Sequence, residues 1–306
     1  MLDLATVSVV ITTCNRPRFL IEAVRSVIAQ TRPPDEVVIV DDGAAGDAER
    51  ALRAVEWPES VAMSVLPGPC RGPAAARNAG IRGASGDLVA FLDDDDLWHP
   101  KKLAQQVRWL AARPEIGALG TVCLRMAAPD MSAARVKRTA GIRRVSRPAL
   151  LRANRLCLSS AVVRRRCLDE SGGFDESLAL AQDWDLWLRI SQRWKIARLR
   201  APLTIYRLHS DQRSRDEMAL RGWEAEVIKR AMARSPGLGM LRGIARRRLS
   251  WAHCRLGRAL LRRGEAEGAV LELKQALSLH PFHPLVWGSL ALCALTAGAA
   301  VEEPRA

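Results

Sequence analysis

Short apolar segments alternate with amphipathic segments over residues 1–125, and this alternation limits the possible folds more than any other feature of the sequence. Apolar runs predict strands at residues 7–12, 36–40, 62–66 and 88–92. Apolar residues at helical spacing predict helices at residues 17–30, 74–85 and 100–113. Strands separated by helices of this length are typical of βαβ units, so we predict a mainly parallel sheet with its ligand site outside the carboxyl ends of the strands.

The rest of the chain divides into three sections. Residues 131–166 carry 11 Lys or Arg and no acid. A shorter αβ section follows, with a turn at residues 172–173, a helix at 182–192 and a strand at 203–206. From about residue 216 the pattern is helical throughout. We therefore predict a first domain at residues 1–215 and an all-helical region at residues 216–306.

The helical region carries a repeat-like pattern of small, large and proline residues. One 34-residue tetratricopeptide unit is matched by Gly257, Leu260, Ala269, Leu273, Ala276 and Pro281, with Gly264 at the turn between helices. Such a unit predicts either a groove for a protein partner or a brace for the first domain. Residues 285–301 carry no charge, which leaves two alternatives open: a packed C-terminal helix or a membrane-buried segment.

The net charge of +14 favours anionic partners, such as phosphorylated small molecules or an anionic membrane face. Nucleic acid is disfavoured, because only 5% of residues are aromatic and no basic run is interleaved with aromatic side chains. The seven cysteines form no CxxC pair, which argues against a disulfide framework or a zinc site. We expect a cytoplasmic protein, with contact to the inner face of the membrane as a further expectation.

Four consecutive acids, Asp93 to Asp96, follow the apolar strand at residues 88–92. Adjacent carboxylates repel one another, and a bound cation removes this repulsion. Oxygen ligands suit Mg²⁺ or Mn²⁺, and Mg²⁺ takes one or two protein carboxylates and completes its shell with phosphate and water. The alternative is a solvated acidic turn that caps the next helix.

Other polar residues are predicted at the same edge of the sheet. Thr12, Thr13, Asn15 and Arg16 follow the first strand, Asp41 and Asp42 end the second, and Arg77 and Asn78 lie in the first turn of a helix, where free amides favour an anion. Each of these residues alone is explained by a turn or a surface charge. Together, a cation, an arginine and a helix N-terminus indicate a diphosphate site.

The motifs VSVVITTCNRP, VVIVDDG, GPAAARNAGI, LVAFLDDDDLWHP, GGFDESL and QDWDLWLRI resemble, in order and spacing, the family 2 glycosyltransferases over about residues 5–210. The resemblance implies the GT-A (Rossmann-like) fold, an α/β fold with a mixed, mainly parallel sheet flanked by helices. It also implies a divalent metal and transfer of a sugar, with inversion, from a nucleoside-diphosphate-sugar to a hydroxyl acceptor, in cell-surface polysaccharide or glycoconjugate synthesis.

The resemblance also assigns roles residue by residue. It implies that Thr12, Asn15, Arg16 and Asp41 hold the nucleoside. Arg77 would lie near the diphosphate or ribose. The predicted position of Thr13, Asp42, Asn78 and Asp94 at the same edge of the sheet adds them to the donor site. Asp93 would contact the ribose and Asp95 the metal, with His209 near the metal or diphosphate. Asp183 would be the general base, with helix capping as its alternative role.

The chain departs from the family pattern at two motifs. Ala44 stands where a serine is usual, and Gln182 stands where the family has Glu before the aspartate. The second change alters the surroundings of Asp183 but keeps the carboxylate. A second hypothesis therefore stays open, that of a catalytically silent GT-A domain that acts as an adaptor through its helical tail.

Overall fold

A computed structural model describes residues 5–43, 46–127, 141–210, 212, 216–235 and 239–299. Residues 131–140 of the basic segment, residue 44 of the second motif, and residues 300–306 of the helical region lie outside this description. The helices and strands follow one another as β1 (Val7–Thr13), α1 (Pro17–Ile28), β2 (Glu36–Asp41), α2 (Asp47–Leu52), β3 (Ala62–Pro67), α3 (Pro73–Gly83), β4 (Leu88–Asp93), β5 (Leu97–Trp98), α4 (Lys102–Ala111), β6 (Ile116–Met126), β7 (Ile142–Val145), α5 (Arg147–Arg152), the 3-10 helix η2 (Leu158–Ser160), β8 (Val162–Arg164), α6 (Arg165–Ser171), α7 (Gln182–Ile190), β9 (Lys195–Arg207), α8 (Glu217–Ala233), α9 (Leu241–Arg262), α10 (Ala266–Leu279) and α11 (Pro284–Ala299).

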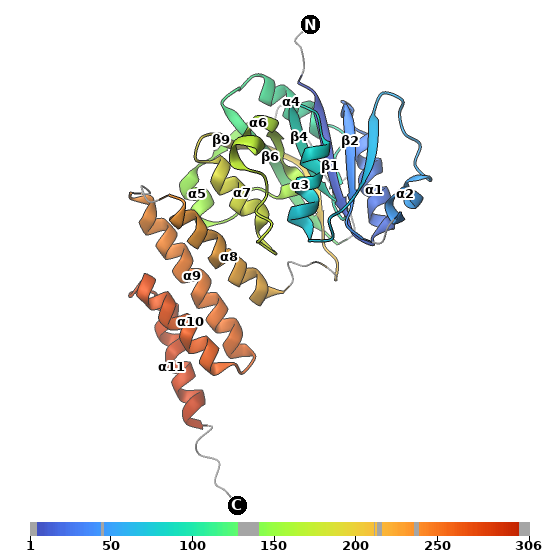
Figure 1. Cartoon of the computed structure of the whole chain (residues 1–306). Coiled ribbons are helices and arrows are strands. Elements are labelled where there is room, and N and C mark those ends of the chain that lie inside the picture. Colours follow the sequence, from blue (N-terminus) through green and yellow to red (C-terminus); the bar gives the residue numbers. More distant parts are fainter. Residues whose placement is uncertain are drawn as a thin grey trace, which may run out of the picture. The chain divides into compact units, whose positions relative to one another are not determined.

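The described strands form one nine-stranded sheet in the order β3-β2-β1-β4-β8-β6-β9-β5, with β7 paired to β9 (Figure 1). Strands β3, β2, β1 and β4 run parallel to one another, as the βαβ pattern predicts. Strand β8 is antiparallel to both β4 and β6, so it joins the first parallel group to the parallel pair β6 and β9. The predicted α/β class with a mixed sheet flanked by helices is therefore confirmed.

The register of the parallel strands brings their carboxyl ends to one edge. Thr13 at the end of β1 pairs with Asp41 at the end of β2. Thr12 pairs with Asp93 at the end of β4. Polar residues 28 to 81 positions apart in the sequence thus become neighbours at the edge where parallel sheets bind ligands.

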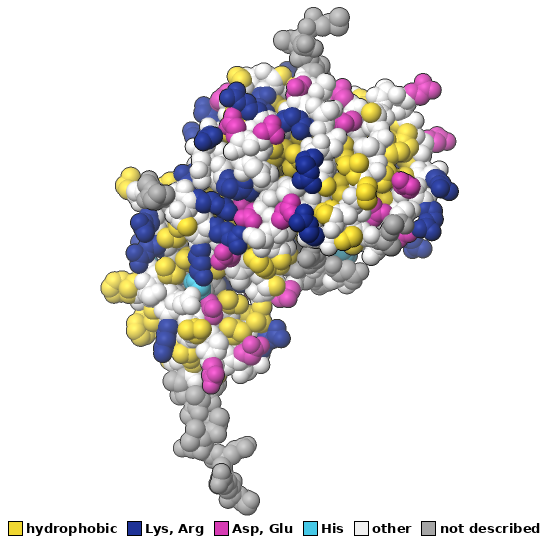
Figure 2. Space-filling model, viewed as in Figure 1, with side chains coloured by type: hydrophobic (Ala, Val, Ile, Leu, Met, Phe, Trp, Pro, Cys, Tyr) yellow, Lys and Arg dark blue, Asp and Glu magenta, His cyan; other side chains and the backbone are white. Residues whose placement is uncertain are grey.

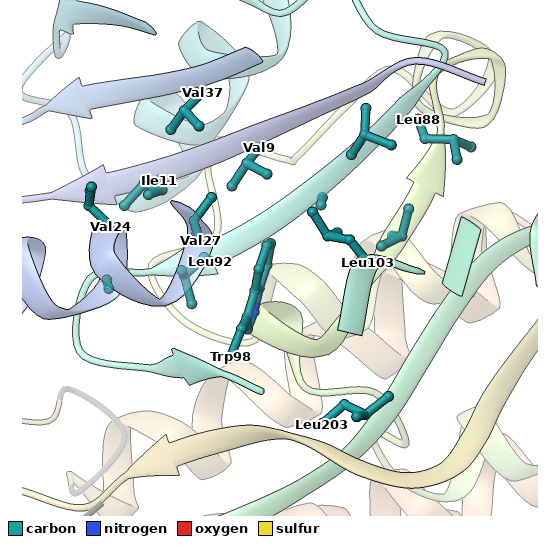
Figure 3. Close-up of a cluster of buried hydrophobic side chains, with 14 of the residues drawn as sticks. Val9, Ile11, Val24, Val27, Val37, Leu88, Leu92, Trp98, Leu103 and Leu203 are labelled. Carbon is teal, nitrogen blue, oxygen red and sulfur yellow. The ribbon is translucent and has the colours of Figure 1, made fainter. Parts of the chain in front are cut away.

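A hydrophobic core lies between the sheet and the helices that cover it (Figure 3). The apolar face of α1 contributes Leu20, Ala23, Val24 and Val27, all fully buried, at the spacing of a single helical stripe. Trp98 of β5 is also fully buried, and its indole nitrogen donates to the carbonyl of Ser159 at 2.6 Å. Trp98 thus fixes the end of the aspartate turn against η2.

Small residues let α3 lie close to the sheet. Ala74, Ala75 and Ala76 are buried, and a Cβ added at Gly80 would collide with Val10 of β1. The motif GPAAARNAGI therefore has a packing reason for its alanines and its glycine. Close packing of α3 against β1 and β2 in turn carries Arg77 to the edge of the sheet.

Five strands depart from the sequence-based predictions, because β5, β6, β7 and β8 were not predicted and β9 is longer than predicted. Strand β9 extends over Lys195–Arg207, whereas only residues 203–206 were predicted, and β6, an 11-residue strand, was missed. In β9, arginines at positions 198 and 200 interrupt the apolar residues, so no continuous apolar run marks the strand. Pairing with β6, β7 and β5 holds this segment extended.

The chain forms two compact units, one of Met1–Leu150 with Asn154–Ser210, and one of Leu151–Ala153 with Asp211–Ala306. The described part of the second unit is helical after residue 216, as predicted, and has its own core around Cys254, Leu273 and Val286. A Cβ at Gly257 would lie 2.9 Å from Leu273, so this glycine allows α9 and α10 to pack closely. The tetratricopeptide assignment stays a prediction.

None of the helices in the described ranges combines the length and the apolar character that a membrane crossing requires. The alternative of a membrane-buried segment at residues 285–301 lies partly outside the described residues.

Candidate active site

The four aspartates after β4 alternate between the protein interior and the site. Asp94 and Asp96 are buried, whereas Asp93 and Asp95 are partly exposed, with 28% and 15% of their side chains accessible. This alternation excludes a fully solvated acidic turn. It also divides the motif into two inward carboxylates, which hold the turn, and two outward carboxylates, which face the site.

The inward carboxylates are held by named donors. The Thr13 hydroxyl donates to Asp94 at 2.7 Å, and a guanidinium nitrogen of Arg16 lies 2.6 Å from the other Asp94 oxygen. Burial raises the pKa of Asp94 to about 7, although Arg16 opposes the shift. Asp96 accepts the backbone N–H of Arg207 at 3.1 Å, and burial raises its pKa well above the usual range.

The outward carboxylate Asp95 contacts two cationic or polar groups through the same oxygen. Arg16 lies 3.0 Å from this oxygen and His209 Nε2 lies 2.9 Å from it. His209 also packs against the ring of Phe19, with centroids 5.2 Å apart. The predicted pair Asp95 and His209 is thus brought together from positions 114 residues apart.

Asp95 and His209 are the best-placed residues for a divalent cation. A carboxylate oxygen and an imidazole nitrogen are ligands that Mn²⁺ accepts, and Mg²⁺ is suited by the carboxylate. Within the described ranges, no group of three or more His, Cys, Asp or Glu side chains has the arrangement of a metal site. The donor set therefore fits a cation that takes one or two protein ligands and completes its shell with a diphosphate and water.

Arg77 connects the aspartate turn with the N-terminus of α7. One of its guanidinium nitrogens donates to Asp93 at 2.7 Å and another donates to Gln182 Oε1 at 2.7 Å. Its side chain is 12% exposed and lies 5.6 Å from the ring centroid of Phe174. Because Gln182 directly precedes Asp183, this bridge places the predicted base beside the aspartate turn.

Asp183 lies in the first turn of α7 and is partly buried. One of its oxygens accepts the backbone N–H of Trp184 at 2.8 Å, and the other accepts the Asn154 amide at 2.8 Å. Burial raises the pKa of Asp183, while the Asn154 hydrogen bond and the charge of Arg77 act in the opposite direction. Asp183 therefore accepts one of the free N–H groups of the first turn, and it lies close enough to Arg77 and Asp93 for their charges to act on its pKa.

The helix that carries Asp183 is fixed by two tryptophans. The indole of Trp184 donates to the carbonyl of Leu150 at 2.7 Å, and the indole of Trp187 donates to that of Leu156 at 3.2 Å. Both rings are fully buried. These hydrogen bonds connect α7 with residues 150–156, the segment that supplies Asn154.

The predicted nucleoside-binding residues lie at the ends of β1 and β2. Asp41 accepts the backbone N–H groups of Gly43 and Ala48, at 3.2 and 3.0 Å. Asp42 accepts the N–H of Cys70 at 2.6 Å. Asn15 has a left-handed backbone, with φ of 55°, and packs against Gly43. These contacts fix the loops that follow β1 and β2, where the nucleoside site is predicted.

Two predicted donor-binding residues are engaged elsewhere. The Asn78 amide donates to the carbonyl of Phe174 and to Glu176, both at 2.9 Å, and its oxygen accepts the N–H of Phe174 at 2.8 Å. Asn78 therefore fixes the loop at residues 173–176, and Thr13 fixes Asp94. A direct contact of either residue with a donor stays a prediction.

Sequence reasoning missed two residues of the site. Asn154 lies in the acid-free segment, where no local pattern marks it as a partner of Asp183. Arg207 donates to the Asp95 carbonyl at 3.0 Å and pairs with Glu22 at 2.5 Å. Arg207 belongs to the same YRLH motif as His209, so the motif itself was the available signal.

Comparisons with known proteins agree with this geometry. The family model "Glycosyl transferase family 2" matches residues 8–148. An uncharacterized glycosyltransferase of Bacillus subtilis, YwdF, is 30% identical over 215 residues, which cover 65% of this chain and 73% of YwdF. Four other curated glycosyltransferases are matched over only 15–35% of their own length.

Solved structures show the same fold. TarS of Staphylococcus aureus, residues 1–349 with UDP-GlcNAc, is 16% identical, with a TM-score of 0.64 over 90% of this chain and 81% of that one. A mannosyltransferase of Pyrobaculum calidifontis, solved with GDP-Man and Mn²⁺, is 24% identical, with a TM-score of 0.58 over 98% of this chain and 81% of that one. With its GT-A fold, its ordered motifs and its match to YwdF, the chain belongs to the family 2 glycosyltransferases.

Proposed function

We propose that this glycosyltransferase moves a sugar from a nucleoside-diphosphate-sugar to a hydroxyl group of a glycan or glycolipid, with inversion at the anomeric carbon and with Mg²⁺ or Mn²⁺ as cofactor. The observation that carries the proposal is the Arg77 bridge, because Asp93 and Gln182 lie at 2.7 Å from one guanidinium. A donor-binding turn and a candidate base thus border one site. The acceptor class, cell-surface polysaccharide or glycoconjugate, rests on the family resemblance.

The aspartate turn and the strand ends provide the donor side of the site. We assign the nucleoside to Thr12, Asn15, Arg16 and Asp41, and the ribose to Asp93. Arg16 and Arg77 supply the positive charge that a diphosphate leaving group requires. A cation held by Asp95 and His209 would add Lewis-acid stabilisation of that leaving group when bound.

We place Asp183 on the side of the site where the hydroxyl acceptor binds. An attacking hydroxyl must lose its proton as the new glycosidic bond forms on the face opposite the diphosphate, and a positioned carboxylate accepts it. The raised pKa of Asp183 makes the carboxylate a stronger base than an exposed aspartate. The amide of Asn154 donates to one oxygen and the backbone of Trp184 donates to the other, which fixes the orientation of the carboxylate.

Arg143 and Arg144 of β7 are exposed, and we propose that they contribute to binding of the acceptor. We assign them to an acidic or phosphorylated acceptor, because the segment around them contains no acid. Replacing both with Gln should raise the KM for such an acceptor and leave the KM for the donor unchanged. An unchanged acceptor KM would contradict this assignment.

A screen of donor hydrolysis tests the proposed function. The full chain would be incubated with UDP-, GDP- and dTDP-sugars and Mg²⁺ or Mn²⁺, with a chelator as control and Asp95→Asn as a matched variant. We expect release of one nucleoside diphosphate, lost on chelation and in Asp95→Asn. If no donor is hydrolysed or bound, the alternative of a silent GT-A domain is favoured.

A further inference from the structure

Three large aromatic side chains of the helical unit are exposed, two of them at the turn between α10 and α11 and the start of α11. Phe282 is 87% exposed, Trp287 60% and Trp251 43%. Single exposed apolar residues are common, but a group of large aromatic residues in water marks an interaction surface. This group plays no part in the core of the unit, which is formed by other residues.

The three aromatic residues are connected through the turn between α10 and α11. Trp251 of α9 packs against the ring of His283, with centroids 4.4 Å apart. Phe282 directly precedes this histidine, and the indole of Trp287 donates to the carbonyl of Pro281 at 2.9 Å. These contacts place the aromatic residues on one continuous surface rather than on separate parts of the unit.

The helix that carries Trp251 is strongly basic. Over its 22 residues α9 contains seven arginines and no acid. Arg248 pairs with Glu224 and Arg262 with Glu217, both on α8, at 2.9 and 3.1 Å. Glutamates of a neighbouring helix therefore compensate this part of the charge.

No carboxylate among the described residues contacts the three exposed arginines that share a helical face with Trp251. Arg247, Arg255 and Arg258 are exposed and stand four residues before and four and seven after the tryptophan. Such spacing puts all four side chains on one face of a helix. We call the surface formed by Arg247, Trp251, Arg255, Arg258, Phe282 and Trp287 the Arg-Trp face. Figure 2 shows dark-blue and yellow side chains side by side over the helical region.

We propose that the Arg-Trp face docks the chain on an anionic phospholipid bilayer. Aromatic side chains flanked by arginines are typical of surfaces that lie in the membrane interface, where rings enter the headgroup region and guanidinium groups meet lipid phosphates. Uncompensated positive charge beside the rings selects an anionic surface over a neutral one. This inference goes beyond the proposed function and does not depend on it.

The test is co-sedimentation of the full chain with vesicles of phosphatidylcholine containing 30% phosphatidylglycerol, and with pure phosphatidylcholine. We expect binding to the anionic vesicles only, weakened in high salt because surface charge is screened. The variant Arg247→Gln, Arg255→Gln, Arg258→Gln should lower vesicle affinity at least about tenfold. Phe282→Ser, whose ring is almost fully exposed and should not affect folding, should also weaken binding.

A matched variant decides whether the position or only the number of charges matters. Arg53→Gln, Arg82→Gln, Arg193→Gln removes the same charge from exposed sites of the first unit and should leave binding within about twofold. The proposal is overturned if wild type fails to bind anionic vesicles, if this control loses as much affinity as the α9 variant, or if light scattering shows a dimer that Phe282→Ser dissociates while vesicles are not bound.

Discussion

The aspartate turn after β4 and the N-terminus of α7 both present carboxylates to the same site, but they hold these groups differently. In the turn, arginine and imidazole contact the carboxylates directly, with Arg16 within 3.0 Å of both Asp94 and Asp95. At α7, Asp183 accepts two neutral N–H groups and its nearest cation, Arg77, binds its neighbour Gln182 instead. Nearby cations favour the charged form of a carboxylate, whereas burial favours its protonated form.

This difference separates two kinds of chemistry within one site. A turn that gathers opposite charges suits the binding of an anion together with a cation. A carboxylate that faces the site with a raised pKa and a fixed orientation suits proton transfer, whereas the raised pKa values of Asp94 and Asp96 belong to buried groups of the turn. The substitution of Gln for the usual Glu at position 182 strengthens the contrast, because an extra carboxylate there would bring further negative charge next to Asp183.

The largest expected effect comes from removing the proton acceptor. Asp183→Asn keeps the shape of the side chain but cannot accept a proton, so we expect the rate of transfer to fall by about 10²–10⁴-fold while donor affinity is retained. Donor binding is measured by calorimetry and transfer by product release. Asp169→Asn on the exposed face of α6 is the control. Full activity of Asp183→Asn would remove the contrast between the two regions.

The next largest effect is expected from Arg77, which connects the aspartate turn with the N-terminus of α7. Lysine in place of Arg77 keeps the charge but lacks the planar guanidinium whose two separate nitrogens donate to Asp93 and Gln182, and hydrogen bonds to charged groups contribute about 1.5–3 kcal/mol. We therefore expect kcat/KM for the donor to fall by about 10- to 100-fold. Arg82→Lys on the same helix, which is exposed, should leave kcat/KM unchanged. If both variants behave alike, the bridge has no functional role.

Adjacent positions of the aspartate turn should separate stability from activity. Asp94→Ala leaves Thr13 without its acceptor and removes one of the two carboxylates that Arg16 contacts, so we expect the free energy of unfolding to fall by about 1–3 kcal/mol. Asp95→Ala should change stability less and abolish metal-dependent turnover. Urea unfolding in chelator, together with donor hydrolysis, measures both properties. The reverse pattern would mean that the inward and outward roles are exchanged.

Much of the first unit could be predicted from sequence because its signals are local. The strands β1, β2 and β4 are continuous apolar runs, and each ends in polar residues at the edge where the site forms. Contacts across long separations in the sequence could not be predicted. Asn154 meets Asp183 over 29 residues and Arg77 meets Gln182 over 105, and nothing in either neighbourhood specifies its partner. The contacts of Asn78 with the loop at residues 173–176 could not be predicted either, and its contact with a donor stays a prediction.

The smallest expected effect concerns the pKa of Asp183. The Asn154 amide donates to the charged carboxylate and so lowers its pKa against the larger effect of burial. Without that donor, Asn154→Ala should raise the pKa of Asp183 further. Because only the deprotonated form accepts a proton, the acid side of the kcat–pH profile should move to higher pH by about one unit, which corresponds to about 1.4 kcal/mol. Activity well above this pKa should stay close to wild type.

A kcat–pH profile measured from pH 5 to pH 9 distinguishes a shift in the pKa of Asp183 from a loss of structure. Unfolding or misplacement of α7 would lower kcat at every pH, whereas a pKa shift lowers it only on the acid side. Gln192→Ala, just beyond the other end of α7, should leave the profile in place. A shift of the acid side to lower pH in Asn154→Ala would mean that the hydrogen bond stabilises the protonated form of Asp183. In that case the contrast between the neutral contacts of Asp183 and the charged contacts of the aspartate turn would no longer explain the proton transfer.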